Sequence, residues 1–66
     1  MNVTADDILK EIPANTKNIT DKLYYLHSAA QSMMYAATFM DDIDLVETIR
    51  AIHRAAQEAS DRLFII

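Results

Sequence analysis

The 66-residue chain contains no cysteine, no glycine and no tryptophan, and it has a single proline. Without cysteine the chain has no disulfide, no thiolate ligand for zinc or an iron–sulfur cluster, and no cysteine nucleophile. Without glycine it lacks the P-loop and the dinucleotide-binding fingerprint, because both bring the backbone close to phosphate. The tight hairpin turns that depend on glycine are also missing, which argues against an all-β fold.

Long apolar runs are absent as well. The longest nearly apolar run covers residues 33–40, whereas a transmembrane helix needs about 20 residues. The first residues are acidic and lack the apolar core of a secretion signal. The net charge is −4 and hydrophobic residues make up 52% of the chain, which is too apolar for a disordered protein. We therefore expect a soluble, acidic, cytoplasmic protein.

Apolar residues recur with alternating spacings of four and three along two stretches, residues 18–40 and about 43–65. The first stripe consists of Ile19, Leu23, Leu26, Ala30, Met33, Ala37 and Met40. The second consists of Leu45, Ile49, Ile52, Ala56, Ala59, Leu63 and Ile66. Both have the heptad spacing of packed helices. The short connection makes the helices antiparallel neighbours, and pairs whose numbers sum to 85 or 86 then align all seven layers.

A shorter helix is predicted at about residues 5–12. Thr4 can cap it together with Asp7, and Pro13 ends the segment because it disfavours helix at the preceding residue. Several residues can cap the helix of residues 18–40, and the pattern does not choose among them: Asn15, Thr16, Asn18 and Thr20. The predicted fold is all-α, with a short helix followed by an antiparallel helical hairpin.

The aromatic residues lie off both heptad stripes. Tyr24 and Tyr35 are eleven residues apart, which separates them by only about 20° around a helix. Tyr25 and Phe39 flank this aromatic stripe, and Phe64 lies off the stripe of the third helix. The helix of residues 18–40 therefore has a second apolar face that needs a cover.

Two covers for the second face are possible. The short helix can supply Ile8, Leu9 and Ile12, or a second copy of the chain can pack there. Three alanines that flank the heptad stripes permit close approach of another helix: Ala29, Ala36 and Ala55. Because a chain this short buries little core, we favour a homodimeric four-helix bundle over a monomeric three-helix bundle.

No recognisable catalytic or metal-binding motif is present. His27 and His53 are the only histidines, and no Glu-x-x-His occurs, which excludes the carboxylate-bridged di-iron pattern. The aspartates at positions 41, 42 and 44 lack the glycine turn and distal glutamate of a calcium loop. We therefore expect no enzyme activity and no cofactor, and we interpret both histidines as packing or hydrogen-bonding residues.

The leading hypothesis is a non-enzymatic protein–protein interaction module, a homodimeric adaptor or regulator that binds another protein. Its candidate interaction residues are Tyr24, Tyr25, Met34, Tyr35, Phe39 and Phe64, because aromatic residues and methionine are frequent at protein interfaces. One alternative is a nucleic-acid regulator that uses Lys17, Lys22, Arg50 and Arg54. Another is an acidic nucleic-acid mimic that uses Asp41, Asp42, Asp44 and Glu47. Against the nucleic-acid alternative, Glu58 and Arg62 have the spacing of an intrahelical ion pair, as expected of a self-compensated surface.

Overall fold

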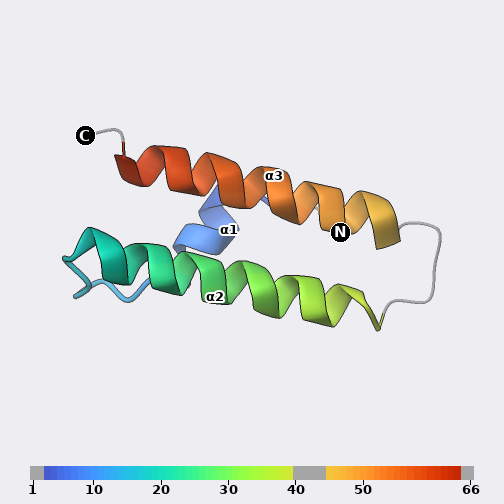
Figure 1. Ribbon diagram of the computed structural model, residues 1–66, viewed down its shortest axis with the longest axis horizontal. Coiled ribbons are helices and arrows are strands. Elements are labelled where there is room, and N and C mark those ends of the chain that lie inside the picture. Colours follow the sequence, from blue (N-terminus) through green and yellow to red (C-terminus); the bar gives the residue numbers. More distant parts are fainter. Residues whose placement is uncertain (1–2, 40–44, 65–66) are drawn as a thin grey trace.

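The computed structural model describes residues 3–39 and 45–64, which form three helices and no strand. Helix α1 spans Ala5–Leu9, α2 spans Ile19–Ala37 and α3 spans Leu45–Phe64. The two long helices run antiparallel and side by side, and α1 lies across them on one side (Figure 1). The all-helical prediction and the antiparallel hairpin are confirmed for this part of the chain.

Helix α1 begins with the predicted capping box. The Asp7 backbone N–H donates to Thr4 Oγ1 at 3.4 Å, and the Thr4 backbone N–H donates to Asp7 Oδ2 at 2.9 Å. The hydrogen bond from the Thr4 backbone, followed by that from its hydroxyl, lowers the pKa of Asp7 below its ordinary value of 3.8. The two reciprocal bonds satisfy the backbone N–H groups of Thr4 and Asp7, which have no partner within the helix.

Helix α1 ends at Leu9, three residues before the predicted end at residue 12. The chain continues as tight turns, in which the Glu11 N–H donates to the Ile8 carbonyl and the Ile12 N–H to the Leu9 carbonyl, both at 3.1 Å. These bonds span three residues instead of four, as at many helix ends. Pro13 then restricts the residue before it, so the α-helical part is only five residues long.

The structure selects one of the four possible caps for α2. Asn18 is the N-cap, and its Oδ1 accepts a hydrogen bond from the Thr20 N–H at 2.7 Å. At the other end Thr38 closes the helix, with its hydroxyl donating to the Tyr35 carbonyl at 2.7 Å. Helix α2 therefore stops at Ala37, before the predicted end at residue 40. The aspartates at positions 41, 42 and 44, which precede α3, lie outside the described residues.

The core between α2 and α3 follows the heptad stripes. One cluster joins Ala30, Ala37 and Ile52, with Met33, Ile49 and Ala56 packed against it. The other cluster brings together Leu26 and Ala59, with Leu63 beside them. Both groupings agree with the predicted layers. Ile19 departs from the pattern, because this first residue of α2 is 39% exposed at the end of the hairpin.

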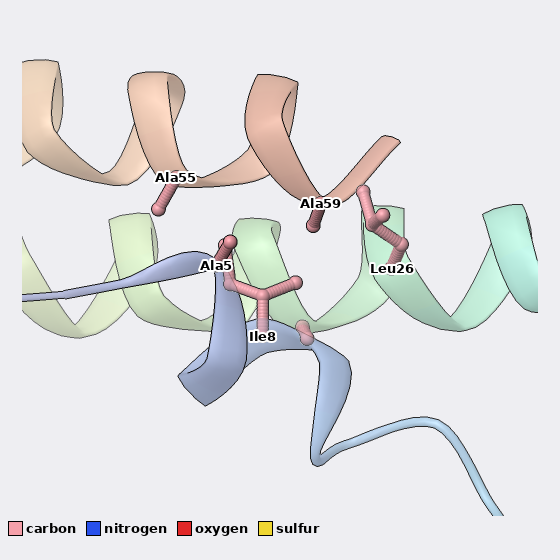
Figure 2. Packing of buried hydrophobic residues seen from close by; sticks show 6 residues of the cluster. Ala5, Ile8, Leu26, Ala55 and Ala59 are labelled. Atoms are coloured by element: carbon pink, nitrogen blue, oxygen red, sulfur yellow. The ribbon is translucent and has the colours of Figure 1, made fainter. Parts of the chain in front are cut away.

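Helix α1 packs on the alanine side of the hairpin. Ala5 and Ile8 are fully buried against Ala29, Ala55 and Ala59, as Figure 2 shows for the labelled residues. Leu9 and Ile12 are half-buried at the edge of the same cluster. The small residues at positions 29 and 55 therefore admit a helix, as predicted, and that helix is α1. Ala36, the third predicted alanine, is exposed.

Candidate interaction surfaces

Helix α2 has three sides with different surroundings. One side packs on α3, a second meets α1 at Ala29, and the side that faces away from α3 is open. No residue from Leu23 to Phe39 is an aspartate, glutamate, lysine or arginine. Exposed apolar patches on soluble proteins commonly mark binding sites, so the open sides of this stretch are the candidate binding sites.

The first candidate is the aromatic face, which we define as Tyr24, Tyr35 and Phe39. Tyr24 and Tyr35 are 69% and 68% exposed on the outer side of α2, and Phe39, two residues after its end, is 73% exposed. Tyr35 and Phe39 form an edge-to-face pair with ring centroids 5.2 Å apart and an interplanar angle of 73°. The pair presents a large apolar surface to solvent in a geometry that aromatic rings favour.

The structure separates the remaining predicted interaction residues from the aromatic face. Tyr25 stacks edge-on with Tyr24 at 5.7 Å, but it lines a hollow of about 310 Å³ near the end of α1, beside Glu11 and Ser28. Met34 is half-buried and packs against the cluster of Ala30, Ala37 and Ile52. Phe64 is on α3 and is 62% exposed. The six candidates therefore do not form one continuous surface.

The second candidate is a groove between α2 and α3, which the sequence interpretation missed. It has a volume of about 290 Å³ and contains both histidines of the chain. We call it the histidine face, and its lining residues are Leu23, Leu26, His27, Ala30, Gln31, Met34, His53, Ala56, Gln57 and Ser60. No charged residue lines it apart from the titratable histidines. Helix α1 packs on the other side of the hairpin, against Ala29 and Ala55.

A stripe on α3 extends the histidine face along the whole hairpin. Val46, His53, Ser60 and Phe64 lie at intervals of seven, seven and four residues, so all four fall within about 40° around the helix. Val46 and Phe64 are both 62% exposed and stand near the two ends of α3. The spacing of these four residues is visible in the sequence, but the prediction used the heptad stripe beside it, which forms the core.

The predicted basic candidates lie in two separate places. Lys17 and Lys22 are at the start of α2, whereas Arg50 and Arg54 line a shallow hollow on α3 together with Glu47. In the antiparallel register, Arg50 lies beside the last turns of α2, about 20 Å from Lys22 along the hairpin at 1.5 Å per residue. The structure therefore does not bring the four side chains into one basic patch.

The acidic candidates are only partly described. Residues 41, 42 and 44 lie outside the described ranges, and Glu47 adjoins the two arginines on α3. Arg62 pairs with Asp6 of α1 at 2.6 Å, rather than with Glu58 as its spacing predicts. Within residues 3–39 and 45–64, no three histidine, aspartate or glutamate side chains gather as metal ligands would.

No protein-family model matches the chain, and no curated protein or solved structure matches it. Among the described helices, none is both long and apolar enough to cross a membrane.

Proposed function

We propose that the protein is a non-enzymatic protein-interaction module, a homodimeric adaptor or regulator that binds another protein through its aromatic face. The observation that supports this is the exposure of Tyr24, Tyr35 and Phe39, each about 70% accessible in a stretch, residues 23–39, that contains no aspartate, glutamate, lysine or arginine. Aromatic residues are enriched in the centres of protein interfaces, and charged residues are depleted there.

The cost of leaving this surface open supports the same proposal. Exposed apolar patches on soluble proteins commonly mark binding sites. The aromatic face has no role in the described fold, because the core is built from the heptad stripes and α1. Tyrosine and phenylalanine side chains that are exposed to this extent are therefore best explained by a partner that covers them.

The distribution of charge favours a protein partner over nucleic acid. A nucleic-acid surface needs basic residues gathered on one face. Here Lys22 and Arg50 are separated along the hairpin, and Glu47 partly offsets the arginines on α3. A nucleic-acid regulator remains the alternative, and salt separates the two: phosphate contacts weaken steeply as salt rises, whereas apolar contacts change little.

The test is affinity capture from the native host with mass spectrometry, comparing the wild-type chain with a Tyr24→Ala, Tyr35→Ala, Phe39→Ala triple variant. The matched control carries Ser28→Ala and Ser32→Ala, also at exposed positions of α2 and outside the histidine face. We expect one protein that the wild type and the control retain at low and high salt and the triple variant loses. Retention of the same protein by the triple variant, or loss of all binding at high salt, would overturn the proposal.

A further inference from the structure

We propose that the histidine face is the self-association surface, where a second copy of this chain docks to complete a four-helix bundle. This inference rests on the proposed function, because it decides which open surface serves the homodimer and which serves the other partner. It assigns the groove of His27 and His53 to the second copy, and it leaves the aromatic face free.

The position of α1 restricts where a four-helix bundle can form. Each hairpin has two broad sides on which another hairpin can pack with both of its helices. Ile8 and Ala5 of α1 occupy the alanine side and are fully buried there. Figure 1 is viewed from the opposite side, with α1 behind the two long helices. That side is the histidine face. A second hairpin can therefore contact α2 and α3 together only on that face.

The net charge of the chain and the lack of charged groups in the groove favour a second copy as the occupant. The chain carries a net charge of −4, so two copies repel each other unless they meet through a surface without charged groups. The groove is lined by apolar residues, glutamines, a serine and the two histidines. Gln57 of this lining donates a hydrogen bond to Asp61 at 3.2 Å.

The area of the face is sufficient for a dimer. The molecule measures 38 × 18 × 14 Å, and the histidine face is the broad side. The outline of that broad side is about 700 Å² on each copy, so a pair that covered all of it would bury about 1,400 Å², which is within the usual range of stable interfaces. Val46 and Phe64 would be covered near the two ends, and these are among the most exposed apolar side chains of α3.

The test is sedimentation equilibrium on the wild type and on variants that place one negative charge on each face. His53→Glu and Ser60→Glu place the charge on the histidine face, and Tyr35→Glu is the matched control on the aromatic face. We expect the wild type and Tyr35→Glu to have about twice the chain mass of 7.5 kDa. The dimer dissociation constant should rise more than tenfold in both histidine-face variants. Circular dichroism checks that each variant stays helical, and Ser60→Glu decides the outcome if His53→Glu does not fold.

Two results would overturn the inference. One is a wild-type chain that stays monomeric up to millimolar concentration. The other is a dimer that Tyr35→Glu dissociates and the histidine-face variants do not, which would make the aromatic face the self-interface. Failure of the proposed adaptor function is separate, because it leaves the dimer intact and removes only partner capture.

Discussion

Replacing Ile8 with alanine should destabilise the protein more than any other single change in α1. Ile8 is 0% exposed and is one of the two largest fully buried side chains in the described residues. The substitution removes three carbon atoms, which at about 0.8 kcal/mol each amounts to about 2.4 kcal/mol. Its neighbours Ala29, Ala55 and Ala59 have no side chains long enough to fill the space. A cavity therefore adds to the loss, for a total of about 3–4 kcal/mol.

This loss is large for so small a protein. A 66-residue domain has a free energy of unfolding of about 3–10 kcal/mol, so Ile8→Ala would remove a third or more of it. Helix α1 has only five residues and cannot persist without packing, because isolated helices shorter than about 12 residues are marginal. We therefore expect α1 to detach and the exposed alanine side of the hairpin to be solvated.

Urea denaturation followed by circular dichroism measures the effect. With a slope of about 1 kcal/mol per molar urea, the midpoint should fall by about 3 M. Leu9→Ala is the matched control, because Leu9 is half-buried on the same helix, and it should shift the midpoint by about half as much. Hydrogen exchange should show faster exchange of the α1 amides in Ile8→Ala. If both variants shift the midpoint equally, or neither shifts it, then α1 does not pack on the hairpin as described.

Three further predictions concern packing, acid and salt. Ala30→Leu should overpack the buried contact of α2 with α3 and lower the free energy of unfolding by about 1–3 kcal/mol, whereas Ser28→Leu at an exposed position should change it by less than about 0.5 kcal/mol; urea denaturation compares them. The folded-state pKa of Asp7 lies below 3.8, so the contribution of this carboxylate to stability is complete above about pH 5 and is lost as the pH falls through the lowered value. Asp7→Asn removes this contribution, and its urea midpoints should therefore depend less on pH across this range than those of the wild type. Arg62→Ala removes the exposed pair with Asp6 and should lower the unfolding free energy by at most about 1 kcal/mol at low salt and less at high salt, as thermal melts can show.

The hairpin was predictable because its signal is long and repeated. Seven layers in each of two helices leave one register that buries both stripes, and Leu26, Ala30 and Ile52 are buried accordingly. Helix ends were less predictable. Beyond Leu9 the hydrogen bonds of α1 span three residues instead of four. Helix ends that differ by one or two residues in this way are not resolved by a sequence pattern.

The candidate surfaces were predictable only in part. Exposure of Tyr24 and Tyr35 follows from their position opposite the heptad stripe, and the structure agrees. The predicted grouping of Met34 and Phe64 with these tyrosines does not follow from the heptad pattern. The face to which each of the two residues belongs depends on how α3 packs against α2. The histidine face exists only when residues of both helices are placed together, so no stripe on one helix defines it.

The side on which α1 packs decides which surface stays open, and side-chain size explains the choice. A short helix gains most where its backbone can come close to the hairpin, and Ala29, Ala55 and Ala59 permit that approach. On the opposite side, His27, Met34 and Gln57 stand in the way. The alanine side therefore allows α1 to pack closely against the hairpin, and the side with larger, uncharged side chains does not. Those larger side chains remain available to a second hairpin, whose length allows it to contact the whole face instead of one turn.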